Sequence, residues 1–149
     1  MYIESLSLRN FKCFGDIAIK FPIQSGVTGF VGDNGAGKSS ALEALKRLFS
    51  PLSSERQLRK SDIHFGFGED SQSVAEREIV IDVVFGFSDP NAIPHVFNDV
   101  FFNASDQSLK VRLLFEGRYV KSESYEDDIE VKLYTVRTLD DVPYGPDDE

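Results

Sequence analysis

The sequence has 149 residues, about the length of one domain, and its 25 acidic residues against 16 Lys and Arg give a net charge of −9. This acidic total argues against a chain that coats DNA with its whole surface, and the lack of an apolar run of eighteen residues argues against a membrane span. The one cysteine, Cys13, excludes an internal disulfide, and the first residues lack a signal-peptide pattern. We therefore expect a cytoplasmic protein with no membrane partner.

The first third of the chain predicts three strands. Residues 2–11 alternate apolar and polar side chains, and residues 17–21 do the same before Pro22 ends the pattern. Residues 27–31 form a short apolar run of the kind that a buried strand shows.

A phosphate-binding loop follows the third predicted strand. Gly32, Gly37, Lys38 and Ser39 match the P-loop pattern G-x-x-x-x-G-K-[ST], between a predicted strand and a predicted helix. Glycines let the main chain turn and close on an anion, and consecutive amides then point inward at phosphate oxygens. The alternative is a turn that only joins strand to helix, but such a turn does not need three glycines followed by Lys-Ser.

The chemistry of this loop predicts ATP and Mg²⁺ as cofactors. The helix N-terminus adds free amides and a favourable dipole to the phosphate site. Lys38 supplies a positive charge for the β- and γ-phosphates and is the predicted catalytic residue. Ser39 offers its hydroxyl to Mg²⁺ as the predicted metal ligand, and Ser40 is the expected next phosphate contact.

A helix is predicted after the loop, with apolar residues at positions 41, 42, 45, 48 and 49. Glu43, Lys46 and Arg47 fall off this stripe, toward water or a partner, and Ser50-Pro51 ends the helix. A polar stretch, residues 53–73, then carries a basic trio of Arg56, Arg59 and Lys60. We interpret the trio either as a solvated face or as a contact for phosphates or DNA.

The second half of the chain predicts an antiparallel meander. Strands are expected at residues 78–87, 109–115 and 129–136, with a helix at residues 91–103 and an acidic turn at residues 123–128. The predicted domain spans residues 1–139, and residues 140–149 are expected to form a flexible acidic tail.

The motifs of residues 1–49 resemble the start of RecF/SMC-like ABC ATPases, which reads I-x-x-L-x-L-x-N-F-[RK]-x-F and then G-x-N-G-x-G-K-S-[ST]-x-L-x-A-L. The matching residues are Ile3, Leu6, Leu8, Asn10, Phe11, Lys12 and Phe14, followed by Gly32, Asn34, Gly35, Gly37, Lys38, Ser39, Ser40, Leu42, Ala44 and Leu45. The resemblance implies an α/β P-loop NTPase, specifically an ABC-type half-head, with a mixed core sheet around the P-loop helix and an antiparallel β lobe.

The resemblance also implies partners and further site residues. It implies a homodimer formed head to head with ATP, and DNA as a partner of the full-length protein. It places Asn34 near the γ-phosphate, and it offers Lys12 either as a phosphate contact or as an exposed lysine in a turn. The expected nucleotide-binding residues are therefore Lys12, Asn34, Gly35, Ala36, Gly37, Lys38, Ser39 and Ser40.

A looser resemblance points to one branch of these ATPases. Residues 61–65 and the strands after them look most like the OLD-family ATP-dependent endonucleases and related phage-defence ATPases. This likeness implies a role in DNA repair, DNA processing or antiviral defence, with a possible nuclease domain or subunit.

The motifs needed for hydrolysis are missing from the sequence. An ABC head needs a Walker B strand ending in Asp-Glu, a signature Leu-Ser-Gly-Gly and a switch histidine. Ile79-Val80-Ile81-Asp82 is the nearest substitute, but Val83 stands where the base would be, so we interpret Asp82 as a surface residue of the strand in preference to a Mg²⁺ ligand. We expect an ATPase completed by residues outside this segment, which alone would be inactive.

Other side chains carry less signal. Gln57, Asp62 and Gln72 are candidates for a Mg²⁺-sensing residue, and none has supporting neighbours in the sequence. His64 and His95 have no carboxylate or cysteine at metal-ligand spacing and are expected to be structural or exposed.

Two alternative functions remain open from the sequence. A small P-loop kinase would need an arginine-rich lid, for which only Arg56, Arg59 and Lys60 qualify, and the acidic second half argues against a second phosphate-bearing substrate. A nucleotide-sensing subunit would bind ATP without hydrolysing it.

Overall fold

The computed structural model describes residues 1–122 and 128–142. The elements are strand β1 (Tyr2–Arg9), β2 (Ile19–Pro22), helix α1 (Lys38–Phe49), β3 (Glu76–Gly86), β4 (Phe102–Asn103), β5 (Leu109–Val120) and β6 (Asp128–Val136), with short 3-10 turns at Ser53–Glu55, Lys60–Asp62, Pro90–Ala92 and His95–Phe97. No helix among these residues is long and apolar enough to cross a bilayer.

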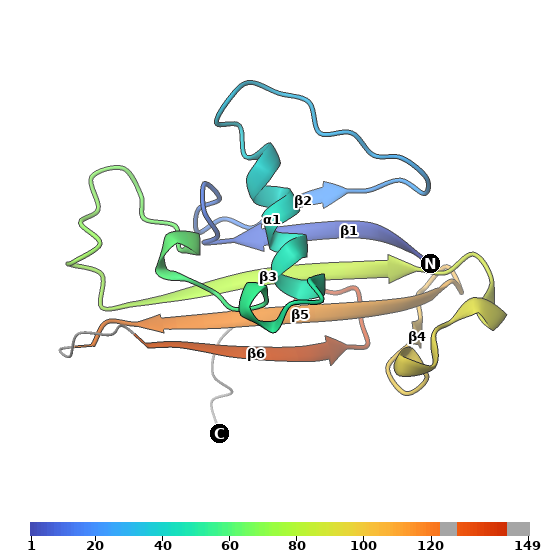
Figure 1. Ribbon diagram of the computed structural model, residues 1–149. Coiled ribbons are helices and arrows are strands. Elements are labelled where there is room, and N and C mark those ends of the chain that lie inside the picture. Colours follow the sequence, from blue (N-terminus) through green and yellow to red (C-terminus); the bar gives the residue numbers. More distant parts are fainter. Residues whose placement is uncertain (123–127, 143–149) are drawn as a thin grey trace.

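The strands form one antiparallel sheet (Figure 1). Its order is β2-β1-β3-β5, and β4 and β6 both pair with β5. Strands β3, β5 and β6 form the predicted antiparallel meander, in which β5 runs five residues beyond its expected end to Val120. The predicted strand at residues 17–21 is the short edge strand β2, which begins at Ile19 and includes Pro22.

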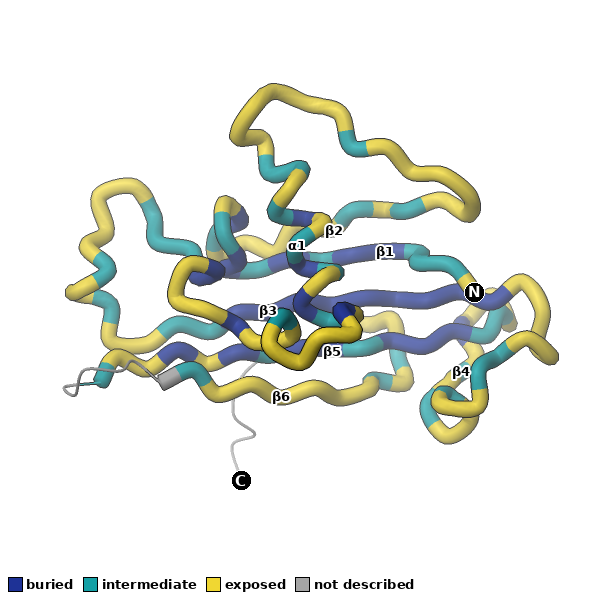
Figure 2. The backbone as a smooth tube through the Cα atoms, in the orientation of Figure 1, coloured by how far each residue is buried: buried dark blue, intermediate teal, exposed yellow. Residues whose placement is uncertain are grey.

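Helix α1 covers one face of the sheet, and the core lies between them (Figure 2). The side chains at alternate positions of the central strands point to this helix, and those of Leu6, Leu8 and Ile81 are fully buried. Ala41 and Ala44 face the sheet from α1, and their small side chains let the helix lie close to the strands. The alternation of apolar and polar side chains along the strands therefore determines which face of the sheet packs against α1.

The apolar run at residues 27–31 does not form the predicted strand. The segment is irregular, and Val27 and Val31 are each 97% exposed. A strand needs a neighbour that accepts its main-chain hydrogen bonds, and none of the described strands pairs with this segment. The mixed core sheet expected around α1 is for the same reason not present among the described residues.

The predicted helix at residues 91–103 is also wrong. Two 3-10 turns, Pro90–Ala92 and His95–Phe97, and the short strand β4 occupy this stretch. Pro94 lacks an amide hydrogen and disfavours helical geometry in the residue before it. Ile93 is accordingly extended, with φ −71° and ψ 122°, so the helix cannot continue through it.

The face of the sheet opposite α1 holds a buried ion pair. Asp82 and Arg112 are about 5% exposed each, and Arg112 Nη2 donates to Asp82 Oδ2 over 2.7 Å. Arg112 Nη1 also donates to the carbonyl oxygens of Thr138 and Asp140, at 2.8 and 2.7 Å. Asp82 is thus a buried structural residue and not the surface residue expected from the sequence. The pair holds the chain after β6 against the back of the sheet.

The proposed boundary between domain and tail stays a prediction. Asp140 is tied to Arg112 through its carbonyl, but residues 143–149 of the expected tail lie outside the described residues. Most of the expected acidic turn, residues 123–127, lies outside them as well.

Candidate nucleotide-binding site

The P-loop joins α1 through a left-handed glycine. Gly37 is the N-cap of the helix, with φ 91° and ψ 7°, and its carbonyl accepts the first helical hydrogen bond from the amide of Ala41 at 3.0 Å. Gly35 also has a positive φ, 87°. Other residues are strained at such angles, so the glycines allow the chain to turn into the helix here.

The amides of this loop are largely free of protein acceptors. From Asn34 to Ser40, one amide, that of Ala36, donates to another described residue, the carbonyl of Asp33 at 3.1 Å. No side chain caps the N-terminus of α1. Unpaired amides at a helix start, together with the positive end of the helix dipole, form a ready anion site.

Lys38 lies over the loop that precedes it. Its Nζ donates to the carbonyl oxygens of Gly32 and Asp33, the second over 2.7 Å. Both acceptors belong to exposed residues, and Lys38 itself is half-buried, so water reaches the ammonium group. Phosphate oxygens are stronger acceptors for an ammonium than neutral carbonyls, so a bound phosphate would compete with the carbonyls of Gly32 and Asp33 for Lys38.

The remaining predicted loop residues are accessible. Asn34, Gly35 and Ala36 are exposed in the loop. Ser39 is exposed and Ser40 half-buried on the first turn of α1, and their hydroxyls form no hydrogen bond with any described residue. A hydroxyl in this position fits the hard oxygen ligands that Mg²⁺ prefers.

A tight turn at residues 10–15 packs against the C-terminal end of the loop. The turn is closed by a 2.8 Å hydrogen bond from the amide of Asn10 to the carbonyl of Gly15, and it packs Cys13 and Phe14 against Gly37. A Cβ atom on Gly37 would lie 2.8 Å from Cys13 Sγ and from Phe14 Cζ. The sequence indicated a break here but gave no sign of this contact, which depends on the tertiary fold.

Lys12 turns toward carboxylates. Its Nζ forms an ion pair with Glu43 of α1 and lies 3.5 Å from Asp62 Oδ1. The amide of Lys12 donates to the carbonyl of Asp62 at 2.7 Å, and His64 Nδ1 lies 2.7 Å from the carbonyl oxygen of Lys12. Lys12 is therefore held next to the P-loop helix, and a phosphate contact for it stays a prediction. His64 is structural.

Asp62 joins α1 to this turn through a buried ion pair. It is fully buried, and Arg47 of α1 donates to both of its carboxylate oxygens at 2.9 and 3.0 Å. The amide of Arg59 donates a third hydrogen bond at 2.9 Å. Burial acts to raise the pKa of Asp62, but the hydrogen bonds from Arg47 and Arg59 outweigh it and hold the pKa below its usual value.

Arg47 was expected to point away from the apolar stripe, toward water or a partner, and it is 7% exposed. The spacing of Ala41, Ala44 and Arg47, three residues apart, puts all three on the buried side of α1 and was the signal that could have found it. Asp62 is engaged by Arg47, so it does not act as the free Mg²⁺-sensing carboxylate that the sequence allowed. Gln57 is exposed, and the carbonyl of Gln72 accepts from Lys121, so neither approaches this network through a described contact.

The chain matches a known family over most of its length and individual proteins over about half of it. A family model described as the AAA ATPase domain matches residues 1–141. The chromosome partition protein Smc of Pyrococcus furiosus is 34% identical over 82 residues, which is 54% of this chain and 7% of that protein. The DNA replication and repair protein RecF of Deinococcus deserti is 38% identical over 69 residues, which is 46% of this chain and 18% of that protein. The chain thus matches only a small part of each relative.

One solved structure shares the fold. It comes from work on the structural biochemistry of ATP-driven dimerization and DNA-stimulated activation of SMC ATPases, and it aligns with a TM-score of 0.53 at 24% identity, over 89% of this chain and 69% of that one. The likeness confirms the predicted fold class, an ABC-type ATPase half-head with an antiparallel β lobe.

Replacing Gly37 with alanine should destabilise the protein by roughly 2–4 kcal/mol. The left-handed backbone at this position is unfavourable for alanine, and the added Cβ atom would also clash with the side chains of Cys13 and Phe14. Gly68→Ala is the matched control, because Gly68 has φ +82° with nothing within 4 Å, and it should cost only about 1–2 kcal/mol. Urea unfolding measures both free energies. An equal loss of unfolding free energy in the two variants would show that the close contact of Gly37 with Cys13 and Phe14 does not add to the destabilisation.

Asp62→Asn should lower the free energy of unfolding at pH 7 by about 3–5 kcal/mol, because it leaves Arg47 buried without its counter-charge. The lowered pKa of Asp62 sets the pH dependence: its contribution is complete above the ordinary carboxyl pKa of about 4 and is lost as pH falls through the folded-state pKa. Unfolding curves from pH 7 to pH 2 should therefore converge for parent and variant in acid. The exposed control Asp99→Asn should follow the parent at every pH.

Proposed function

Because this chain belongs to the AAA ATPase domain family, we propose that it is the ATP-binding N-terminal segment of a RecF/SMC-like ATPase that acts on DNA. One observation carries the proposal: a complete P-loop motif opens α1 with unpaired amides from Gly37 to Ser40 and with Lys38 beside them. A neutral connecting turn has no need for such a set of donors.

The proposed binding mode uses groups that are already in place. The phosphates of ATP accept hydrogen bonds from the loop amides, and Lys38 exchanges the carbonyls of Gly32 and Asp33 for the β- and γ-phosphates. Ser39 would hold Mg²⁺, which neutralises phosphate charge when bound, and Ser40 adds a further hydroxyl. The reaction of the full-length protein is phosphoryl transfer to water, in which positioning and charge neutralisation supply the rate.

We propose that residues outside this segment complete the catalytic site. Asp82, the nearest match to a Walker B aspartate, pairs with Arg112 on the face of the sheet away from α1. Among the described residues the carboxylate of Glu43, on α1, is paired with Lys12. The exposed apolar residues Val27 and Val31 support the same view, since a neighbouring strand from outside the segment would cover them.

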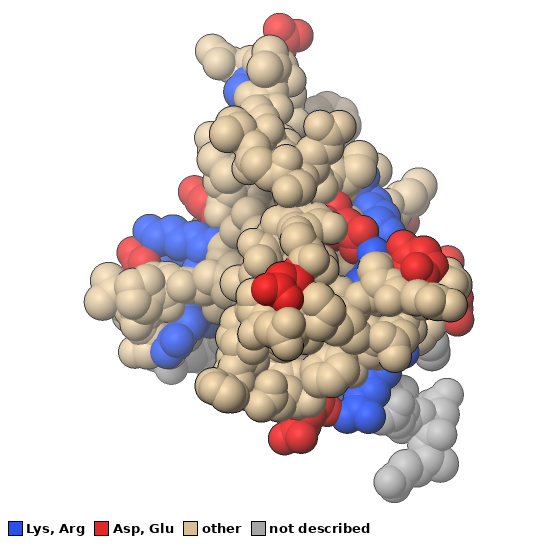
Figure 3. Space-filling view, turned by 90° about the vertical axis from the view of Figure 1, so that its right-hand side faces the viewer, with Lys and Arg blue, Asp and Glu red and all other residues tan. Residues whose placement is uncertain are grey.

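The finer assignments are proposals of the same kind. We infer that ATP joins two heads into a homodimer and that DNA is bound by the full-length cytoplasmic protein. The face in Figure 3 mixes basic and acidic side chains without a continuous basic patch, which favours DNA contacts made elsewhere. The likeness of residues 61–65 to OLD-family enzymes supports a role in DNA repair or phage defence, with a nuclease domain or subunit.

Lys38→Ala should abolish measurable ATP binding, because the loop loses the charge that meets the β- and γ-phosphates. Calorimetric titration of the chain with ATP and Mg²⁺ measures this, and we expect affinity to fall at least about a hundredfold, as for the loss of a charged hydrogen bond. Lys20→Ala, at an exposed position of β2, removes an equal charge and should bind as the parent does. Unchanged binding by Lys38→Ala would end the proposal.

The chain alone should bind ATP without turning it over, because Glu43 on α1 and the buried Asp62 beside it are both engaged in ion pairs. Phosphate release measured beside equilibrium binding tests this, and we expect a rate equal to that of Lys38→Ala. Turnover that Lys38→Ala removes would place the catalytic base within these 149 residues. The same pair of measurements bears on a nucleotide-sensing subunit, which would show binding without hydrolysis in the full-length protein too.

A further inference from the structure

Strand β6 leaves one of its two edges unpaired. It pairs with β5 along its entire length, from Asp128 opposite Val120 to Val136 opposite Arg112. None of the described residues pairs with its other side, and it lies at the margin of the sheet (Figure 1). Most of its residues are exposed (Figure 2). A strand in this position presents a row of free amides and carbonyls.

The two edges of the sheet differ in how they are protected. Strand β2, at the opposite edge, has four residues and ends at Pro22, which cannot donate a hydrogen bond. Strand β6 has nine residues and contains no proline or glycine. An edge of this length that is neither shortened nor interrupted is suited to pairing with another strand.

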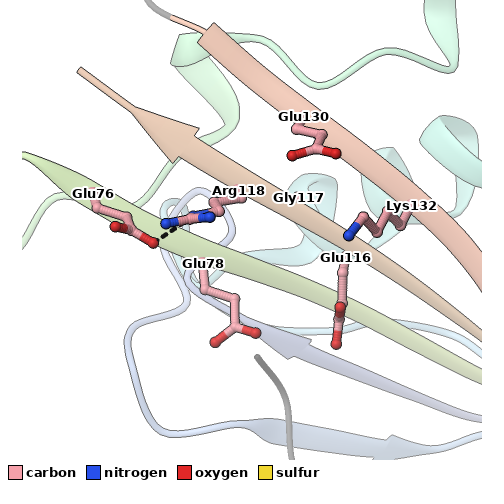
Figure 4. Close-up of a pocket in the computed structure, with 7 residues that line it drawn as sticks. All are labelled: Glu76, Glu78, Glu116, Gly117, Arg118, Glu130 and Lys132. Atoms are coloured by element: carbon pink, nitrogen blue, oxygen red, sulfur yellow. Dashed lines mark hydrogen bonds and ion pairs between the residues drawn. The ribbon is translucent and has the colours of Figure 1, made fainter. Parts of the chain in front are cut away.

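The side chains of β6 divide into two rows. Ile129, Val131 and Leu133 share the face on which α1 lies, and Val131 and Leu133 are 38% and 58% exposed. Glu130 and Lys132 share the opposite face, where Figure 4 shows them projecting from the same strand. One face thus carries apolar side chains, and the other carries Glu130 and Lys132, which have opposite charges.

We propose that β6 pairs antiparallel with β6 of a second copy of this chain, with Val131 opposite itself. In this register Glu130 of each copy faces Lys132 of the other, so two opposite-charge pairs form. On the other face Ile129 meets Leu133 of the second copy. A shift of the centre by one residue would put Lys132 opposite Lys132 or Glu130 opposite Glu130, so charge selects the register.

The pairing has a defined geometry. A twofold axis perpendicular to the sheet keeps each face of one copy continuous with the same face of the other, so both α1 helices lie on the same side. The two six-stranded sheets join into one. This contact uses no residue of the P-loop, so it goes beyond the proposed ATP-dependent joining of heads and needs no nucleotide.

The interface is small, and the dimer should be weak. A single pair of strands buries less surface than a stable complex needs, which places it in the transient class. Its charged pairs lie at the surface, so salt should weaken association. Sedimentation velocity without nucleotide, at chain concentrations up to about 500 µM, suits this range of affinity.

Charge reversal tests the register directly. Glu130→Lys and Lys132→Glu each place like charges opposite one another twice and should weaken self-association about tenfold or more. An equimolar mixture of the two variants should associate again, because both opposite-charge pairs return. The double variant Glu130→Lys, Lys132→Glu should self-associate, and Lys20→Glu on β2 should behave as the parent.

The mixture also distinguishes a lost contact from misfolding, because a variant that failed to fold would not associate with the other variant in the mixture. Circular dichroism confirms that each variant keeps its strands. A parent that stays monomeric over the whole concentration range would overturn the proposal, and so would single variants that associate as the parent does. Association that requires ATP, or that Lys38→Ala removes, would also overturn it and assign the contact to the P-loop side.

Discussion

One buried carboxylate ties the P-loop helix to the turn that follows β1. Asp62 receives both hydrogen bonds of the Arg47 guanidinium, and its main-chain carbonyl holds the amide of Lys12. Helix α1 and the turn at residues 10–15 are thereby linked at a point with no access to water. Together with the packing of Ala41 and Ala44 in the core, this link keeps Gly37 close to Cys13 and Phe14. The position of the P-loop thus depends on an ion pair that is not itself part of the loop.

The chain has one part with a buried core of its own, the sheet with α1, and one part that lacks such packing, the segment before the P-loop. In the antiparallel sheet the central strands are paired on both sides, and residues such as Ile81 and Val83 are completely buried. The segment that leads into the P-loop has no partner strand among the described residues, and Val27 and Val31 are exposed to water. This division is physically reasonable for a segment that matches only a small share of its Smc and RecF relatives.

Local patterns predicted the features that depend on local chemistry. The glycines, Lys38 and the helix after them are set by backbone geometry within a few residues, and the structure has α1 at Lys38–Phe49 as expected. Alternation found the strands of the meander for the same reason. The run at residues 27–31 has the composition of a strand, yet a strand also requires a neighbour, which no pattern within the run can supply.

Burial of charge was the other property that the sequence did not reveal. Arg47 was expected toward water or a partner, and Asp82 was expected at the surface. Each is buried beside an oppositely charged residue distant in the chain, Asp62 for Arg47 and Arg112 for Asp82. The helix expected at residues 91–103 failed on a local signal, Pro94, whose effect on the preceding residue outweighed the helical pattern. The two buried ion pairs depend on tertiary contacts, whereas the effect of Pro94 is local and can be read from the sequence.

The contact of Cys13 with Gly37 has a practical consequence. Cys13 is the single cysteine of the chain, and it is exposed although its sulfur touches the N-cap of α1. A fluorophore or spin label coupled to this thiol would sit beside the P-loop in the unaltered sequence. Changes in its emission or mobility would then follow rearrangement of the loop in real time, without any engineered attachment point.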